Sequence, residues 1–314
     1  MKPTALKLGD KIGVLAPSSP CSPERFQTGI KEIERRGYRV EVALDPVAAY
    51  GKSTYLFSSD TAARRTEALH ALFQDSEIKA VIAARGAYGS LELLPHIDFE
   101  LIKKNPKIFV GFSDVTILLS PMFSLSNLNT FHGPMVSGAF AEDLGQHQGA
   151  KRSVDLLLEV LRGNVANPFS DESYPMIQSG EGQGVVKGGS LTSLVSLLGT
   201  KWEPELDGSI LFLEEIGERP YQVHRLFMQL KLAGKLEQLS GVILGSFTGC
   251  SHAHGPTVAD VFKDIFGAYG YPVISGVPAG HGPLNLVMPL GIKAKIYNNR
   301  IEFLESGVNT SNTQ

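Results

Sequence analysis

Ser113 lies where a predicted strand turns into a predicted helix. The apolar run Ile108–Val110 leads into Gly111, and an apolar helical segment begins at Val115. A sharp turn at the carboxyl end of a parallel strand exposes a serine hydroxyl, and the amides at the start of the next helix can stabilise an oxyanion. The Gly-x-Ser spacing matches half of a nucleophile elbow, although Val115 replaces the usual second glycine. Because serine is also a common N-cap, a nucleophile and a plain helix cap both stay open.

A glycine-containing loop, Arg85–Gly89, follows the buried apolar segment Ile78–Ala84. Glycines permit unusual backbone angles, and free N–H groups in such a loop suit an oxyanion hole or an anion-binding nest. The spacing is neither that of a Walker A motif nor that of G-x-G-x-x-G. The loop is a candidate oxyanion site, with an ordinary strand-to-helix connection as the alternative.

Two carboxylates, Glu214 and Glu215, end the apolar strand predicted at Ser209–Leu213. Since side chains alternate along a strand, the two carboxylates point to opposite sides of the sheet, and one of them can face a pocket. A helix cap or an exposed acidic strand end is the competing interpretation.

Histidine is the usual general base near neutral pH, and His281 lies in a rigid Gly/Pro-rich loop, Gly276–Pro283. An ordinary surface histidine is the alternative. His132 either lines the same cleft or caps a strand. The pair His252 and His254 has no second cluster to complete a tetrahedral set, so we expect no metal site.

The elements that must position these residues alternate between strands and helices over the first half of the chain. Proline at the first helical position and periodic apolar residues predict helices after Ser22 and after Asp60. We expect strands at Lys11–Pro17, Tyr38–Val42, Ile78–Ala84 and Lys107–Val110. Strands separated by helices in this way predict a mostly parallel sheet that is covered on both faces, and therefore an α/β protein.

The stretch from about residue 163 to 184 is rich in Asn, Ser, Pro and Gly, which is typical of a linker between domains. We therefore expect an N-terminal domain over residues 1–165, a linker over 166–183 and a C-terminal domain over 184–314. In the last of these we predict strands and helices in alternation, and a closing hairpin that turns at Asn298 and Asn299. The helices are expected at Leu191–Leu198, Arg219–Leu232 and Val258–Phe266.

Composition limits the function classes. The chain has 314 residues, a formal net charge of −3, 43% hydrophobic residues and 19% charged residues, which is the range of ordinary globular proteins. No strong positive field is present to gather nucleic acid or an anionic membrane, so neither is expected as a partner. The first residues carry no apolar run typical of a signal peptide, and the two cysteines fit a reducing compartment; we expect a cytoplasmic protein.

The order of these motifs is more specific than any one of them. The chain resembles, over nearly its whole length, the LD-carboxypeptidases of serine peptidase family S66, a group that includes the microcin C immunity peptidases. The motifs that carry the resemblance are Val14–Ser19, Ala84–Gly89, Gly111–Asp114, His132–Met135, Lys187–Leu191, Leu211–Glu215, Pro220–Arg225 and Gly280–Gly282.

The resemblance implies a Rossmann- or flavodoxin-like parallel-sheet N-terminal domain and a smaller C-terminal α/β domain of the swivelling β/β/α type. It also implies a Ser-Glu-His triad at Ser113, Glu214 and His281, in a cleft between the domains. The oxyanion hole would comprise the N–H of Asp114 and one from the Gly86–Ala87 turn. No metal or organic cofactor is implied, the partner is a small peptide substrate, and a homodimer is expected.

Three departures from the family pattern are visible. Ala87 replaces a second glycine, and a positive φ there would be strained. Glu215 replaces a frequent aspartate, and His224 replaces the usual aspartate before Arg225. The choice of Glu214 over Glu215 as the triad acid rests on motif alignment.

The function that the resemblance implies is hydrolysis of the bond between diaminopimelate and the terminal D-alanine of murein tetrapeptides, in peptidoglycan recycling. The first alternative is an immunity-type peptidase that cleaves peptidyl- or aminoacyl-nucleotides with the same triad. A two-domain protein that closes on a ligand without chemistry is the second, because fold alone does not fix function.

Overall fold

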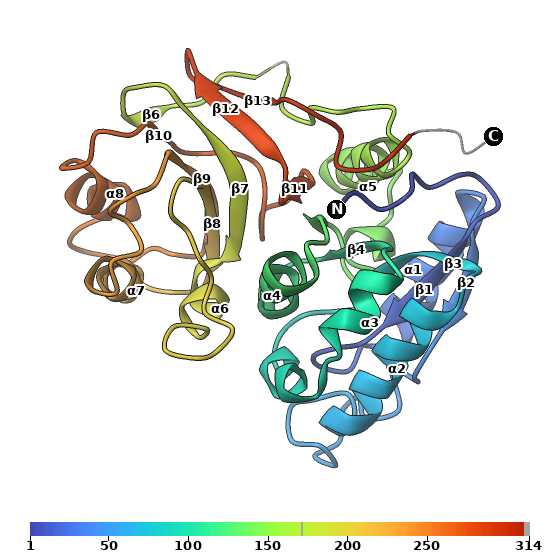
Figure 1. Cartoon of the computed structure of the whole chain (residues 1–314). Coiled ribbons are helices and arrows are strands. Elements are labelled where there is room, and N and C mark those ends of the chain that lie inside the picture. The colour runs from blue at the N-terminus through green and yellow to red at the C-terminus, as the bar shows by residue number, and fades with distance from the viewer. Residues whose placement is uncertain (171, 311–314) are drawn as a thin grey trace.

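The computed structural model describes residues 1–170 and 172–310, which form two β-sheets lying side by side, each flanked by helices (Figure 1). The first sheet and its helices form the N-terminal domain, and the second sheet forms a separate β/α domain. This arrangement confirms the expected two-domain α/β fold. No helix within the described ranges is long and apolar enough to cross a membrane.

The first sheet has six strands in the order β11-β5-β4-β3-β1-β2. Its members are β1 (Lys11–Leu15), β2 (Arg39–Val42), β3 (Ile78–Ala83), β4 (Ile108–Gly111), β5 (Thr130–His132) and β11 (Met288–Leu290). All of them pair in parallel except β11, which is antiparallel to β5. The order 2-1-3-4-5 is that of flavodoxin-like sheets, in which ligands bind beyond the carboxyl ends of β1 and β3.

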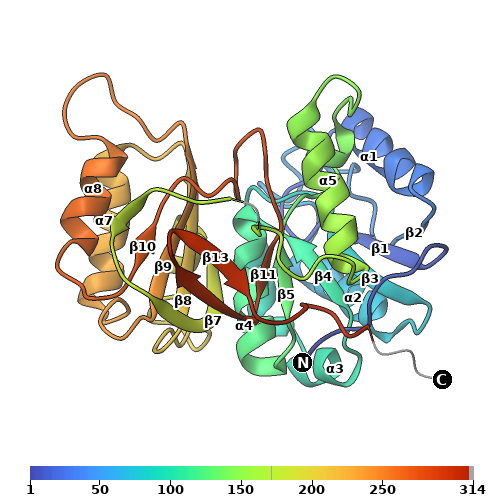
Figure 2. The same cartoon turned by 90° about the horizontal axis from the view of Figure 1, so that it is seen from above.

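Helices cover both faces of this sheet because its strands are apolar on both faces. Along β3, Ala80 and Ile82 pack with α1 (Pro23–Arg35) and α5 (Gln148–Leu161). Val81 and the other apolar residues on the opposite face of the sheet pack with three further helices. These are α2 (Ala62–Gln74), α3 (Phe99–Lys104) and α4 (Thr116–Ser126). Figure 2 shows α1 and α5 together on one side of the domain.

The second sheet has seven strands in the order β13-β12-β7-β8-β9-β10-β6. Its strands are β6 (Met176–Gln178), β7 (Gly182–Ser190), β8 (Ile210–Ile216), β9 (Gly241–Thr248), β10 (Val273–Ile274), β12 (Lys293–Tyr297) and β13 (Arg300–Phe303). The four central strands β7 to β10 run parallel to one another. At the edges, β12 pairs antiparallel with β7, β13 antiparallel with β12, and β6 antiparallel with β10. Asn298 and Asn299 both have positive φ, 47° and 63°, which confirms the predicted two-residue hairpin turn.

The two faces of β8 have different neighbours. Leu211 and Leu213 pack outward in the cluster that includes the helices α6 (Leu191–Val195), α7 (Pro220–Leu232) and α8 (Val258–Phe266). Ile210 and Phe212 point the other way, into the apolar cluster that the second sheet shares with the helices of the first domain. The side-chain period of two therefore decides which residues of β8 face the first domain.

The path of the chain differs from the expected division at two places. β6 lies inside the stretch expected to be a linker, and it forms the antiparallel edge of the second sheet. β11 follows the second domain in sequence but joins the first sheet beside β5, where Pro289 is tolerated because the strand is at the edge. Both strands are only three residues long and pair with distant segments, so no local periodicity of the sequence predicts them.

Candidate active site

Ser113 occupies a strained turn between β4 and α4. Phe112 is extended, and Ser113, the first residue of the short helix η2 (Ser113–Val115), adopts a left-handed φ of 62°. A left-handed conformation is unfavourable for a residue with a Cβ and is retained where the surroundings impose it. Gly111 is required because a Cβ there would lie 2.6 Å from Val115 Cγ1. No backbone N–H in the described chain donates to the Ser113 hydroxyl, so Ser113 is not a side-chain helix cap.

The loop between β3 and η1 (Ser90–His96) lies directly against this turn. A Cβ added at Gly86 would lie 3.0 Å from Ser113 Cβ and 3.3 Å from Ser113 Oγ. Ala87 has a φ of 82°, so the strain expected for a non-glycine residue at this position is present. Within residues 1–170 and 172–310, the N–H groups of Gly86 and Ala87 have no hydrogen-bond acceptor. These donors are therefore available to an anion beside the serine hydroxyl.

Asp114 is buried, and its carboxylate connects the two turns. Its Oδ2 accepts a hydrogen bond of 2.8 Å from the backbone N–H of Ser90, at the start of η1. The backbone N–H of Asp114 itself has no acceptor among the described residues. The structure thus places a third free amide next to Ser113, on the residue that follows it.

Glu214 and His281, 67 residues apart in sequence, form a hydrogen-bonded pair. His281 Nδ1 donates to Glu214 Oε2 at 2.7 Å, and the backbone N–H of His281 donates to the same oxygen at 3.1 Å. Glu214 is fully buried, whereas the His281 side chain is 15% exposed. A carboxylate that accepts from Nδ1 leaves Nε2 as the nitrogen that can take up a proton. Gly280 is required here, since a Cβ would lie 2.4 Å from Glu214 Oε2.

Glu215 points to the opposite face of β8 and has a different set of partners. Its carboxylate accepts hydrogen bonds from the backbone N–H and the hydroxyl of Thr192 at 2.8 and 2.7 Å, and from the N–H of Ile216 at 2.9 Å. Burial raises the pKa of Glu215 above its ordinary value, and these donors oppose that shift. Glu215 therefore anchors the start of α6, and only Glu214 of the two carboxylates contacts His281.

An aromatic contact brings the serine turn and the histidine loop together. The ring of Phe112, next to Ser113, lies 4.8 Å from the His281 ring, centroid to centroid, and 5.5 Å from the ring of His132. His132 in turn lies 4.9 Å from the ring of Phe212 on β8. The four rings form a column that runs from one sheet to the other, and it holds the two halves of the site in contact.

His132 is fully buried in this column, and neither of its ring nitrogens has a hydrogen-bond partner in the described chain. Burial, and to a lesser extent the neighbouring His281, lowers the pKa of His132 to about 3. It is therefore a neutral packing residue at ordinary pH. Of the two interpretations that the sequence left open, lining the cleft and capping a strand, the second agrees with its position as the last residue of β5.

A cavity of about 520 Å³ opens beside His281 and Phe112, and part of its lining from the first domain consists of residues that the sequence did not single out. Arg25 on α1 forms an ion pair of 2.6 Å with Glu142, and both line the cavity together with the first turn of α5. Nothing in their local sequence distinguishes these residues from exposed helix and loop residues. Packing of α1 and α5 on the same face of the sheet is what brings them to the site.

His252 and His254 lie in an exposed loop, where His252 Nδ1 and the carbonyl oxygen of His254 are 2.9 Å apart. Throughout the described ranges, no group of three or more His, Cys, Asp or Glu side chains is arranged to hold a metal ion.

Known families and structures match this chain over nearly its full length. The LD-carboxypeptidase N-terminal domain matches residues 12–133, and the LD-carboxypeptidase C-terminal domain matches residues 183–296. A probable murein peptide carboxypeptidase of Bacillus subtilis is 34% identical over 98% of this chain and 95% of its own. The murein tetrapeptide carboxypeptidase of Pseudomonas aeruginosa is 30% identical over 93% and 95%.

Among solved structures, the protein MccF in complex with glutamyl sulfamoyl guanosine superimposes with a TM-score of 0.86 at 27% identity, covering 98% of this chain and 99% of that one. The two family domains together span most of the chain, and they correspond to the two domains of the fold. On these matches, the protein belongs to the LD-carboxypeptidase family of hydrolases.

Proposed function

We propose that the protein is a serine-type LD-carboxypeptidase in which Ser113 is the nucleophile, His281 the general base and Glu214 the carboxylate that orients it. The proposed reaction removes the terminal D-alanine from the L-centre of diaminopimelate in murein tetrapeptides. On the pattern of the family, we place the enzyme in the cytoplasm, in peptidoglycan recycling, and as a homodimer.

The observation that carries this proposal is the buried Glu214–His281 hydrogen bond beside the Ser113 turn. A carboxylate that holds Nδ1 fixes the tautomer in which Nε2 is basic and stabilises the imidazolium once it forms. The strained φ of Ser113 and the contact between the Phe112 and His281 rings support a nucleophile that lies near this base. The two murein peptide carboxypeptidases at 30–34% identity support the choice of substrate.

In the proposed mechanism, His281 takes the proton of Ser113 as its oxygen attacks the carbonyl carbon of the diaminopimelyl–D-alanine bond. The oxyanion that forms is stabilised by the free N–H groups of Asp114 and of the Gly86–Ala87 turn. His281 then protonates the amine of D-alanine, which leaves, and an acyl-enzyme ester remains on Ser113. Water activated by His281 hydrolyses this ester and restores the serine.

The test is release of D-alanine from L-Ala-γ-D-Glu-meso-diaminopimelyl-D-Ala by the purified protein. Ser113→Ala is expected to lower kcat by roughly 10⁴-fold or more, because the covalent route is lost, while the circular dichroism spectrum is unchanged. The same variant must also lose labelling by a serine-directed fluorophosphonate. Retained D-alanine release by Ser113→Ala would refute the role of Ser113.

The high structural similarity to MccF supports a second candidate function, the cleavage of aminoacyl-nucleotides. Recognition of a nucleobase needs an aromatic ring with a free face near the site. Trp202, the single tryptophan, has the Lys201 ammonium 4.6 Å from its ring centroid, and it is not among the described residues that line the cavity beside His281. Trp202 therefore gives no support to a nucleotide substrate.

Turnover of the tetrapeptide and of an aminoacyl sulfamoyl adenosine, measured side by side, distinguishes the two candidates. A kcat/KM that is larger for the nucleotide conjugate would overturn the peptidase proposal. A protein that binds either compound but is never labelled at Ser113 would instead be a binding protein without chemistry.

A further inference from the structure

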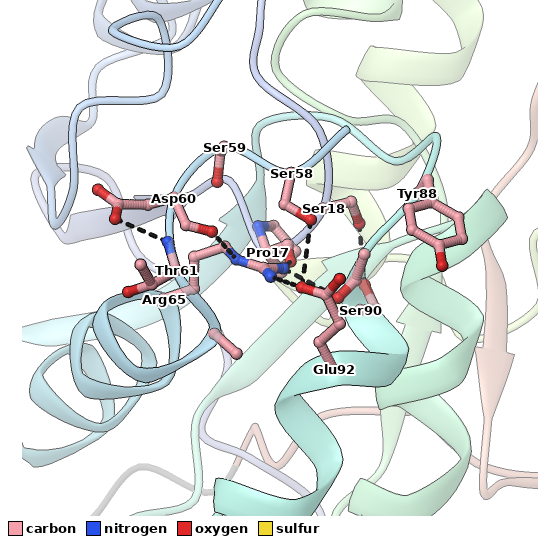
Figure 3. Close-up of polar contacts among 12 residues, drawn as sticks. Pro17, Ser18, Ser58, Ser59, Asp60, Thr61, Arg65, Tyr88, Ser90 and Glu92 are labelled. Carbon is pink, nitrogen blue, oxygen red and sulfur yellow. Dashed lines mark hydrogen bonds and ion pairs between the residues drawn. The ribbon is translucent and has the colours of Figure 1, made fainter. Parts of the chain in front are cut away.

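Arg65 on α2 is fully buried, which is rare for an arginine and requires that its charge and donors be satisfied. Figure 3 shows the guanidinium among three loops. Its Nε donates to the carbonyl of Asp60 at 2.9 Å, and its Nη1 donates to the carbonyls of Gly89, at 2.9 Å, and Pro17. Its Nη2 pairs with the carboxylate of Glu92 on η1. Burial lowers the pKa of Arg65, and Glu92 opposes that shift.

The loop at residues 85–90, which supplies one side of the proposed oxyanion hole, is held from behind through its carbonyl oxygens. The Gly86 carbonyl accepts from the N–H of Ser19 at 3.2 Å, and the Tyr88 carbonyl accepts from the Ser19 hydroxyl at 3.4 Å. The Gly89 carbonyl accepts from Arg65. These bonds fix the loop through its carbonyls, while the N–H groups of Gly86 and Ala87 stay without an acceptor in the described chain and Gly86 lies against Ser113.

The loop backbone lies close to both Ser58 and the guanidinium at Gly89. Gly89 has a φ of 123°, and a Cβ there would lie 2.6 Å from Ser58 Oγ and 3.1 Å from Arg65 Nη1. A side chain at this position would collide first with Ser58, and a residue with a Cβ rarely adopts this φ, so glycine is required beside the guanidinium. Ala87 and Gly89 thus both have positive φ, on either side of Tyr88.

The far end of the loop is attached to the nucleophile turn. The hydroxyls of Ser90 and Ser18 are 2.8 Å apart, and the N–H of Ser90 donates to Asp114 Oδ2 at 2.8 Å. The loop is thus held between Arg65 behind it and the residue that follows Ser113. A shift of the loop away from Arg65 would move the Gly86 and Ala87 amides relative to the serine hydroxyl.

We propose that Arg65 is a positioning residue for the reaction: by holding the Gly89 and Pro17 carbonyls together, its guanidinium sets the distance between the Gly86–Ala87 amides and Ser113. The inference rests on the proposed function, in which those amides stabilise the oxyanion. Arg65 acts only through the loop, because it contacts the backbone of the loop and none of the reacting groups. Its planar fork spreads its donors over three nitrogens, whereas the donors of lysine all lie on one nitrogen and cannot span the same set of acceptors.

The test uses two variants and a matched control in the full chain. Arg65→Lys keeps the charge opposite Glu92 but loses the fork, and Arg65→Gln loses both. Arg64→Gln changes the neighbouring arginine, which is 60% exposed and pairs with Asp60 at the surface. For each protein, the measurements are the rate of fluorophosphonate labelling of Ser113, kcat and KM for D-alanine release, and the melting temperature.

We expect Arg65→Lys and Arg65→Gln to label and turn over about 10- to 100-fold more slowly than wild type, with KM changed by less than about twofold. Loss of one oxyanion donor lowers kcat by about 10²- to 10³-fold, and a displaced donor retains part of that effect. Arg64→Gln is expected to match wild type. A purely structural role would instead lower the melting temperature and leave labelling at 20 °C unchanged.

The proposal is overturned if folded Arg65→Lys is labelled at the wild-type rate, or if its defect lies entirely in KM. Should Arg65→Gln not fold, the lysine variant decides, since it retains the buried charge. Labelling needs no knowledge of the natural substrate. A wild-type protein that is labelled but releases no D-alanine would therefore refute the proposed substrate, and the labelling comparison would still test Arg65.

Discussion

Replacement of Glu214 by glutamine tests the carboxylate of the proposed triad, with Glu215→Gln as the matched control on the same strand. Glutamine is nearly isosteric with glutamate, so the hydrogen bond from His281 Nδ1 at 2.7 Å can persist through the amide oxygen. What is lost is the negative charge that stabilises the imidazolium as it forms. The carboxylate is fully buried, so water cannot replace it.

The size of the effect follows from the charges. Unit charges about 4 Å apart attract by about 4 kcal/mol at an effective dielectric constant of about 20. Each 1.36 kcal/mol of barrier changes the rate by about tenfold, so kcat should fall by roughly 10³-fold in Glu214→Gln. KM should change by less than about threefold, because the buried carboxylate is shielded from the substrate by His281.

Glu215→Gln should behave differently. Its amide can still accept from Thr192, but an NH2 group then faces the N–H of Ile216, so the free energy of unfolding should fall by about 1–2 kcal/mol. The expected kcat stays within about threefold of wild type. Both variants are measured by D-alanine release and by denaturant unfolding at pH 7.5. The assignment of roles would be refuted if kcat fell more in Glu215→Gln than in Glu214→Gln, or if it fell less than tenfold in Glu214→Gln.

Two further predictions concern single residues of the site. His132 has a pKa of about 3 when folded, so only the unfolded chain takes up its proton as the pH falls below about 6.5, and stability declines. Between pH 6.5 and 5 the unfolding free energy of wild type should therefore fall by about 2 kcal/mol more than that of His132→Phe, as measured by denaturant unfolding. Equal falls in the two proteins would contradict this. A residue with a Cβ at the left-handed φ of Ala87, 82°, is unfavourable by about 1–2 kcal/mol, and Ala87→Gly removes this strain. Glycine in turn loses more backbone entropy on folding, which costs about 0.5–1 kcal/mol. The substitution should raise the unfolding free energy by up to about 1 kcal/mol with kcat unchanged, and a lower unfolding midpoint would show that the alanine is not strained.

Local patterns in the sequence predicted most elements of both domains. Proline at the first turn and the apolar spacing placed α1, which begins at Pro23, and the helix Val258–Phe266 was predicted with the bounds that the structure has. The hairpin at Asn298 and Asn299 follows from asparagine's tolerance of positive φ. These features depend on residues close in sequence, so they can be predicted from the local sequence.

The alternation of β8 placed Glu214 and Glu215 on opposite faces, but it did not identify which face meets the first domain. That depends on the packing of Phe212 and Ile210 against the first-domain helices, and hence on contacts between segments that lie far apart in the sequence. The hydrogen bond between Glu214 and His281 likewise depends on segments that are distant in sequence packing together. The family pattern selected Glu214, and the geometry supplies the physical reason for preferring it.

The sequence by itself determined the chemical types of the candidate residues and the turns that carry them: a serine after a strand, a loop with free amides, a carboxylate at a strand end and a histidine beside glycine. Only the tertiary structure decided that β11 crosses to the first sheet, that a neutral His132 lies between the two halves of the site, and that the buried Arg65 holds the loop behind the amides. The physical reason is that turn and strand propensities are set by neighbouring residues. Burial, hydrogen-bond partners and pKa shifts depend instead on which distant segments pack together.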